Sequence, residues 1–197
     1  MQPIELSTER LLLDQPTTRD VRTITEACQD PIFERFMTLP WPYQTEHAAY
    51  FVATVAPEGW DSGREATWAL RPRSAPSELL GMISVRADTN DIGYWLVPSH
   101  RGRGYMTEAV EGVVGWAMET RFCGSGPIRW SCTPGNVASA GVARKAGLRY
   151  TGVGPSPIAM RDGTYPDSWL GEHVGLRDPD QWPRETFTAS RLAKTPA

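Results

Sequence analysis

A short turn rich in arginine and glycine is the clearest candidate for chemistry in this sequence. Arg101-Gly102-Arg103-Gly104 follows a predicted strand at 91–97 and precedes a predicted helix at 107–119. Glycine lets the backbone adopt positive φ and approach an anion closely. The first amides of a helix lack partners within the helix, and its dipole favours negative charge there. With two arginines beside it, the turn is predicted to bind an anion such as a pyrophosphate.

Two common nucleotide motifs do not match this turn. A mononucleotide-binding loop ends in Gly-Lys-Ser or Gly-Lys-Thr, and the chain contains neither. A dinucleotide fingerprint needs a third glycine, but Gly104 is followed by Tyr105-Met106-Thr107, and the turn lies past the middle of the chain. An unrelated nucleotide-binding protein is therefore the weaker interpretation.

Polar side chains elsewhere are candidates for contact with a ligand. Asn136 and Ser139 are three residues apart in a predicted helix and share a face, although Asn136 alone is also a common helix cap. Arg144, near the end of that helix, can meet a phosphate or simply complement the helix dipole. Asp91 begins the strand before the glycine turn. It can serve as a base, or it can be a turn residue after Asn90.

The composition is that of an ordinary globular protein and argues against several classes. Of 197 residues, 40% are hydrophobic and 22% are charged, with a formal net charge of −3. Nucleic acid is not an expected partner, because no basic excess is present. No apolar run approaches the about 18–20 residues that cross a membrane, and the start lacks a signal-peptide pattern, so a cytoplasmic location is expected. Isolated histidines and widely spaced cysteines predict no metal site.

The rest of the chain predicts the elements that would position these residues. Helices and strands alternate in a way that indicates a mixed α/β (α+β) structure, with helices layered on one central sheet. A single domain is expected over 1–180, followed by a polar tail over 181–197. Strands are predicted at 10–15, 65–71, 78–87, 91–97, 128–133, 148–153 and 168–176, and helices at 17–29, 32–37, 45–57, 107–119 and 136–146.

Taken in order, these motifs resemble the GNAT superfamily of N-acetyltransferases and its RimJ/RimL-like branch. Arg101, Gly104 and Met106 occupy the three defined positions of the R/Q-x-x-G-x-G/A acyl-CoA signature. The similarity covers roughly residues 6 to 176. It also includes Thr8-Glu9-Arg10-Leu11-Leu12-Leu13, Asp30-Pro31, Pro40-Trp41-Pro42, Ile92-Gly93-Tyr94-Trp95-Leu96, and Asn136-x-x-Ser139-x-x-Val142-x-x-Lys145-x-Gly147-Leu148.

The resemblance implies a GNAT acyl-CoA N-acyltransferase fold. Its mostly antiparallel sheet would splay open between the strands at 91–97 and 128–133, and the pantetheine arm of acetyl-CoA would lie in the split. A ligand amide can satisfy the backbone groups that such a split exposes. The implied cofactor-binding residues are Leu96, Val97, Arg101, Gly102, Arg103, Gly104, Tyr105, Met106, Thr107, Asn136, Ser139 and Arg144.

The resemblance also implies the reaction, which is direct transfer of an acetyl group from acetyl-CoA to a primary amine in a ternary complex. Ser139 would hydrogen-bond the departing sulfur, and Asp91 would take a proton from the amine, frequently through water. Trp41 and Trp95 are candidates for the acceptor pocket. Cys132 alternates with core positions on its strand, and no histidine near it in sequence could activate it, so an acyl-enzyme is not expected.

The sequence leaves the acceptor open among a protein N-terminus, an amino acid and a small-molecule amine. An α-amine has a pKa of about 8 and a lysine about 10.4, so a weak base such as Asp91 suits the former better. A non-catalytic acyl-CoA sensor is the alternative. The presence of both Asp91 and Ser139 favours the enzyme. A homodimer is suggested by the resemblance only.

Overall fold

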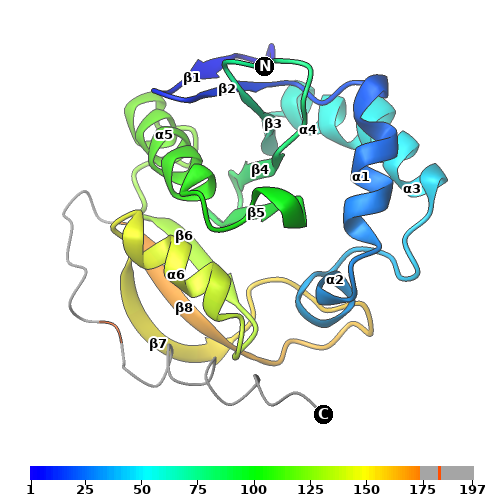
Figure 1. Ribbon diagram of the computed structural model, residues 1–197. Coiled ribbons are helices and arrows are strands. Elements are labelled where there is room, and N and C mark those ends of the chain that lie inside the picture. The colour runs from blue at the N-terminus through cyan, green and yellow to red at the C-terminus, as the bar shows by residue number, and fades with distance from the viewer. Residues whose placement is uncertain (174–181, 183–197) are drawn as a thin grey trace.

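A computed structural model describes residues 1–173 and Trp182, and shows two antiparallel sheets flanked by helices (Figure 1). In the five-stranded sheet the strands follow the order β1-β2-β3-β4-β5, and in the three-stranded sheet the order is β6-β8-β7. The expected mixed α/β fold with flanking helices is confirmed. The strands are β1 (Leu6–Ser7), β2 (Leu11–Asp14), β3 (Glu65–Pro72), β4 (Gly81–Arg86), β5 (Ile92–Leu96), β6 (Ile128–Cys132), β7 (Arg149–Pro155) and β8 (Asp167–His173).

The two sheets meet where β5 and β6 begin and then separate. Asp91 and Arg129 form a parallel bridge there, and the Arg129 amide donates to the Asn90 carbonyl at 2.7 Å. No further pairing joins β5 to β6 within the described residues. The expected split between these strands is therefore present.

The edge of β5 that faces the split carries backbone groups that are not paired with another strand in the described part of the chain. The Val97 amide donates to the Leu80 carbonyl at 2.9 Å, and β4 pairs with β5 in an antiparallel ladder. Because such a ladder alternates, Trp95 and Val97 direct their backbone groups towards β4, whereas Tyr94 and Leu96 direct theirs towards the split.

Two helices cover the face of the sheet next to the split. α5 (Tyr105–Thr120) and α6 (Val137–Lys145) pack together on one side of the molecule (Figure 1). Val110 and Val113 of α5 are fully buried in a core shared with Trp68 and Ile83. These four side chains follow the helical and strand periods of their elements, so α5 is fixed by an apolar stripe on an apolar sheet face.

The opposite face is covered by the helices between β2 and β3. Ile24 and Ala48 are buried against Met82 of the sheet. The short α2 packs into the same cluster through Phe33. These elements are η1 (Thr18–Asp20), α1 (Val21–Cys28), α2 (Pro31–Phe36), α3 (Thr45–Tyr50), the π-helical η2 (Phe51–Val55) and α4 (Ala56–Ser62), while η3 (Pro98–His100) follows β5.

The helical segment that begins at Thr45 does not end near Pro57 as predicted. It continues through Ser62, and the stretch expected to be a loop is α4. Proline lacks the amide that a helix interior needs, but Pro57 stands in the first turn of α4, where that donor is not required. The π-helical turn η2 ends at Val55, so α4 begins anew at Ala56 and Pro57 falls in its first turn.

Trp182 does not belong to a polar tail, although the sequence placed it there. Its side chain is buried, its indole donates to the Leu148 carbonyl at 2.9 Å, and its ring contacts those of Trp130 and Tyr150. The other residues of the expected tail, 181 and 183–197, and the expected domain boundary at 180 lie outside the described residues.

Candidate functional site

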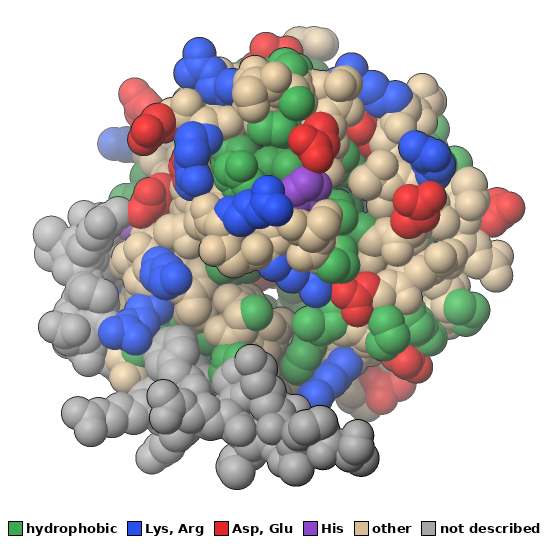
Figure 2. Space-filling model, in the orientation of Figure 1, with side chains coloured by type: hydrophobic (Ala, Val, Ile, Leu, Met, Phe, Trp, Pro, Cys, Tyr) green, Lys and Arg blue, Asp and Glu red, His purple; other side chains and the backbone are tan. Residues whose placement is uncertain are grey.

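A cavity of about 510 Å³ lies at the split between the two sheets. Its walls come from β5, the start of α5, β6 and α6 on one side, and from α2 and the connection between β7 and β8 on the other. Figure 2 shows a hollow near the middle of this face, bordered by hydrophobic and basic side chains. Segments distant in sequence therefore enclose one space.

The glycine turn borders the cavity at the start of α5. Gly102 and Gly104 have φ of 79° and 80°, a region that side-chain-bearing residues rarely adopt. Gly104 is the N-cap of α5 and offers no side chain to its first turn. The amides that follow, including those of Met106 and Thr107, are thus left for a ligand. Gly102, Gly104, Met106 and Thr107 all line the cavity.

Arg101 lines the cavity but already has partners. Its Nη1 lies 3.1 Å from Oδ2 of Asp30, and its Nε donates to the Leu96 carbonyl at 3.2 Å. The other carboxylate oxygen of Asp30 accepts the Ile32 amide and caps α2. Arg101 therefore connects the glycine turn to the start of α2, on the opposite wall.

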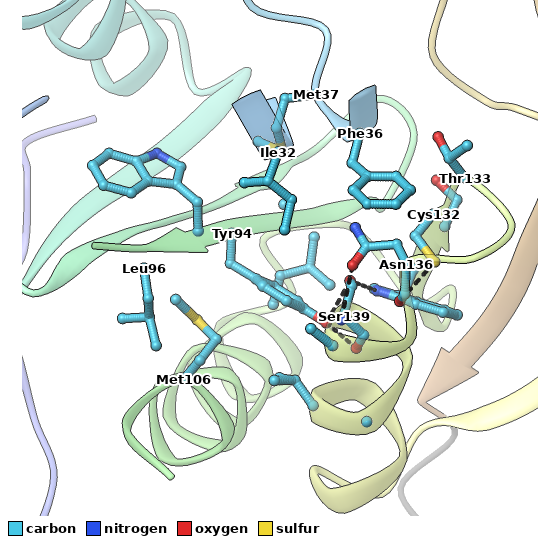
Figure 3. A pocket seen from close by; sticks show the side chains of 18 of the residues that line it. Ile32, Phe36, Met37, Tyr94, Leu96, Met106, Cys132, Thr133, Asn136 and Ser139 are labelled. Carbon is cyan, nitrogen blue, oxygen red and sulfur yellow. Dashed lines mark hydrogen bonds between the residues drawn. The ribbon is translucent and has the colours of Figure 1, made fainter. Parts of the chain in front are cut away.

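Ser139 and Asn136 lie together at the start of α6, as expected. The Asn136 side chain accepts the Ser139 amide at 3.2 Å, so it caps the helix and also borders the cavity. The Ser139 hydroxyl accepts from the Trp130 indole at 3.1 Å and donates to the Tyr94 phenol oxygen at 3.2 Å. Tyr94 in turn donates to the Ser139 carbonyl at 2.9 Å (Figure 3).

Tyr94 is a site residue that the sequence reasoning did not single out. It lies on β5 between Ile92 and Leu96, and all three side chains point to the face covered by α5 and α6. Burial raises the pKa of its phenol above the ordinary value, so the hydroxyl stays protonated at neutral pH. Alternation along the strand identified its face, but nothing in the sequence indicated Ser139 as its partner.

Asp91 lies at the base of the split, where β5 meets β6, and lines the cavity. It is only 2% exposed. Its Oδ2 lies 2.9 Å from Nη1 of Arg86, and its Oδ1 is 3.5 Å from the Ser131 hydroxyl. Burial raises the pKa of Asp91 to about 6, although the Arg86 charge acts in the opposite direction. A carboxylate with this pKa can exchange a proton near neutral pH.

Cys132 also lines the cavity, at the end of β6, and is less deeply buried than a core position. Burial raises the pKa of its thiol to about 12. The thiol therefore stays protonated at neutral pH, and only the thiolate is an effective nucleophile.

Val97 does not fit the role that the resemblance implied. Its amide donates to Leu80, and its carbonyl accepts the His100 amide at 3.0 Å. Both backbone groups are used within the protein, and Val97 is not among the cavity residues. Leu96, which does line the cavity, and Tyr94 are the residues whose backbone faces the split.

Two other residues of the glycine turn point away from the cavity. The Arg10 guanidinium lies 4.8 Å from the centre of the Tyr105 ring and donates to the Arg103 carbonyl at 3.0 Å. Neither the Tyr105 nor the Arg103 side chain lines the cavity. The turn is held from its outer side by Arg10, because Glu108 of α5 accepts from both the backbone and the side chain of Arg10.

On α6, Lys145 rather than Arg144 reaches the cavity. Ser139, Val142 and Lys145 are spaced at three-residue intervals and line it together. Arg144 precedes Lys145 by one residue and therefore lies on a different face of the helix, where it is exposed and outside the cavity. The sequence analysis had assigned Arg144 to the cofactor, whereas the side chain that borders the cavity is Lys145.

Of the two tryptophans proposed for the acceptor pocket, only Trp95 lines the cavity. Trp95 lines the cavity and meets Phe33 edge to face, with ring centroids 5.7 Å apart. Trp41 instead packs against the core beneath α1 and α3 and lies outside the cavity.

Groups able to hold a metal are absent from the part of the chain that the structure describes, since no three His, Cys, Asp or Glu side chains cluster there. None of the helices in that part is both long and apolar enough to cross a membrane.

Comparison with known proteins identifies the family. The model of the acetyltransferase (GNAT) domain matches residues 10–149. No curated protein matched the chain in sequence. Among solved structures, a candidate ribosomal-protein-serine acetyltransferase from Vibrio cholerae aligns with a TM-score of 0.74 at 18% identity, over 88% of this chain and 99% of that one.

Two further structures are similar in fold. RimL, a ribosomal L7/L12 α-N-protein acetyltransferase in complex with coenzyme A, gives a TM-score of 0.71 at 18% identity over 89% of this chain and 100% of that one. The microcin C7 self-immunity acetyltransferase MccE, in complex with acetyl-CoA and AMP, gives 0.69 at 16% identity over 85% and 93%. At these identities the likeness concerns the fold.

Proposed function

Because the chain belongs to the GNAT acetyltransferase family, we propose that it transfers the acetyl group of acetyl-CoA directly to a primary amine held in the same cavity. One observation carries the proposal. The cavity at the split is continuous from the glycine turn at the start of α5 to Ser139 and Asp91, so an anionic donor and an amine can meet inside it. Bringing two substrates together in a fixed geometry is a large part of catalysis for such a reaction.

The donor is assigned to the wall made by β5, α5 and α6. The pyrophosphate would meet the amides at the start of α5 over Gly102 and Gly104, with Arg101 beside it. The pantetheine arm would pair with the backbone of Leu96 along the exposed edge of β5. Lys145 supplies a further positive charge on the same side.

The acyl transfer itself needs an amine lone pair and a leaving thiolate. The amine nitrogen attacks the thioester carbonyl carbon, and the carbon–sulfur bond breaks as the carbon–nitrogen bond is completed. Ser139 is assigned to hydrogen-bond the departing sulfur, because it lines the cavity. Its single hydroxyl proton is donated to Tyr94 in this structure, so it would turn from Tyr94 to the sulfur as negative charge develops there. A thiol has a pKa of about 8.5, so a hydrogen bond suffices and full proton donation by serine is not required.

The proton lost by the amine is assigned to Asp91. Its carboxylate borders the cavity and has a pKa near 6, so it is ionised at neutral pH and can accept a proton through water. Arg86 holds it in position. The same features disfavour the alternative of a non-catalytic acyl-CoA sensor, which would require neither Asp91 nor the oriented Ser139 hydroxyl.

The acceptor is proposed to be the α-amine of a peptide or a small-molecule amine. RimL acts on a ribosomal protein α-amine, and that protein shares this fold. An α-amine is about a tenth neutral at pH 7, which suits a weak base such as Asp91. A cytoplasmic location and a homodimer remain predictions made from the sequence and the resemblance.

The proposal is tested by calorimetry with acetyl-CoA, followed by an amine panel monitored through release of free thiol. We expect binding at tens of micromolar or tighter and thiol release that depends on the amine. Ser139→Ala should lower turnover while leaving acetyl-CoA affinity within about twofold. Absence of acetyl-CoA binding, or binding with no transfer to any amine, would contradict the proposal.

A further inference from the structure

The wall of the cavity opposite the donor side is apolar. Ile32 and Phe36 of α2 and Met37, which follows it, face the cavity from one side, while Leu96, Met106 and Ser139 lie on the other (Figure 3). Ile158 and Met160, from the connection between β7 and β8, complete the apolar wall. We call these five side chains, Ile32, Phe36, Met37, Ile158 and Met160, the apolar wall. All five are half-buried, so they have surface available for a ligand.

The two segments of the apolar wall are tied together by Arg161. Its guanidinium donates to the carbonyl of Leu39 at 3.1 Å, to that of Met37 at 3.3 Å, and also to that of Glu34. These carbonyls belong to the end of α2 and the residues after it, where helix carbonyls lack partners within the helix. The tie holds Ile158 and Met160 next to α2, so the wall is part of the folded cavity.

Among the residues that the structure describes, the charged side chains that line the cavity leave no partner for a second ammonium group. The charged residues of its lining are Arg86, Asp91, Arg101 and Lys145, and none of them belongs to α2 or to the connection between β7 and β8. Asp91 is the acidic residue of that lining, and it is buried and paired with Arg86. Placing an unpaired charge against the apolar wall would be unfavourable, because it would lose hydration without gaining a partner.

From this geometry we infer that the acceptor is a primary amine next to a large apolar substituent, with no second positive charge. The α-amine of a peptide that begins with phenylalanine, methionine or leucine has this chemistry. The amine would lie near Ser139, and its side chain would contact the apolar wall. This inference rests on the proposed function, because it concerns the second substrate of the same cavity. Polyamines and aminoglycosides are poor acceptors on this basis.

Matched tripeptide amides test the inference with the full chain and acetyl-CoA. The peptides differ only in the first residue, which is phenylalanine, serine or lysine. We expect kcat/KM for the phenylalanine peptide to exceed those for the other two by about tenfold or more, as burial of a phenyl group predicts. Equal rates, or a preference for serine or lysine, would overturn the inference while leaving the proposed function intact. Failure of acetyl-CoA to bind would instead count against the proposed function.

A charge placed in the apolar wall provides the reciprocal test. Met160→Glu should reduce the preference for phenylalanine by about tenfold and raise kcat/KM for the lysine peptide, because the new carboxylate supplies the missing partner. Tyr165→Glu is the matched control, since Tyr165 lies in the same connection but is 59% exposed and outside the cavity. If both variants keep the wild-type preference, the side chain of the acceptor does not contact this wall.

Arg161→Met removes the hydrogen bonds that join the two segments of the apolar wall. Its effect is measured separately on the KM of the acceptor and on the Kd of acetyl-CoA, because misfolding would change both. We expect the KM for the phenylalanine peptide to rise about fivefold or more, with acetyl-CoA affinity unchanged, because only the acceptor side loses its support. Arg22→Met, at an exposed position on α1, is the control. A rise in the Kd of acetyl-CoA equal to the rise in KM, or no change in KM, would contradict a role confined to the acceptor side.

Discussion

The Tyr94 phenol oxygen lies 3.2 Å from the Ser139 hydroxyl and 2.9 Å from the Ser139 carbonyl, so one side chain on β5 contacts both the main chain and the side chain of one residue on α6. The two residues are 45 positions apart in sequence and lie on either side of the split. Tyr94 thereby fixes where the Ser139 hydroxyl sits in relation to the donor wall. It acts as a positioning residue for the group assigned to the leaving sulfur.

Removing the Tyr94 hydroxyl should slow transfer without weakening donor binding. Tyr94→Phe keeps the ring in the core and deletes both hydrogen bonds, each worth about 0.5–1.5 kcal/mol. We expect kcat to fall by about three- to thirtyfold and the Kd of acetyl-CoA to stay within about twofold of wild type. In the Tyr94→Phe, Ser139→Ala double variant the two effects should be strongly non-additive. Simple additivity would show that Tyr94 does not act through Ser139.

The low-pH limb of the rate profile should report Asp91. Its pKa is raised to about 6, so the carboxylate needed as a base is lost as the pH falls below that value. We expect kcat to decline about tenfold per pH unit below 6, and this limb should be absent in Asp91→Asn, which remains slow throughout. A limb unchanged in position in Asp91→Asn would assign it to another group. The stability of the protein should change in the opposite direction. Ionisation of Asp91 is unfavourable in the folded state, so protonation of its carboxylate below pH 6 raises the free energy of unfolding.

Asp30→Asn and Arg101→Met should change donor affinity in opposite directions. Arg101→Met removes a positive charge beside the pyrophosphate, and we expect acetyl-CoA to bind about tenfold more weakly. Asparagine caps a helix as well as aspartate does, so Asp30→Asn preserves α2 while removing the carboxylate that competes for Arg101. Affinity should then rise by up to about fivefold, the limit for an exposed ion pair. Calorimetry decides this, and weaker binding by Asp30→Asn would show that the ion pair supports the donor site.

Gly104, immediately before α5, and Gly115, inside it, provide a matched pair of substitutions that tests the role of the glycine turn. Gly104→Ala places a Cβ at a φ of 80°, which costs about 1–2 kcal/mol and distorts the amides that follow. We expect lower stability and at least about tenfold weaker acetyl-CoA binding. Gly115→Ala lies inside the same helix with open space around the added methyl group, and should gain up to about 1 kcal/mol. Denaturant midpoints and calorimetry distinguish the two, and equal behaviour would contradict a special role for Gly104.

A buried ion network far from the cavity should control stability alone. Arg71 is fully buried, with Nε 2.6 Å from Asp14 and its two terminal nitrogens 2.9 and 2.8 Å from Asp20. Asp20→Ala leaves the guanidinium without its bidentate partner, and we expect a loss of about 3–5 kcal/mol. At a temperature where the variant is folded, kcat/KM should stay close to wild type. A selective loss of activity in folded protein would link this network to the site.

The sequence by itself determined the features that depend only on residues close together in the chain, such as backbone conformation, apolar periodicity and helix capping. The conformation of the glycine turn was predictable because glycine at positions 102 and 104 permits the positive φ that the backbone adopts there. The strands and helices around it were predictable from the period of their apolar residues, and Asn136 from its place before a helix. Where a local rule has an exception, as at Pro57, the prediction was wrong.

Only the tertiary structure decided which side chains meet, because packing between elements far apart in sequence sets those contacts. It selected Lys145 over Arg144, placed Trp95 in the cavity and Trp41 outside it, and used both backbone groups of Val97 within the protein. Packing between distant elements also forms the residue pairs that hold the donor side of the cavity and the apolar wall. They are Tyr94 with Ser139, Arg101 with Asp30, and Arg161 with the end of α2, and each joins segments brought together only when the sheets and helices pack.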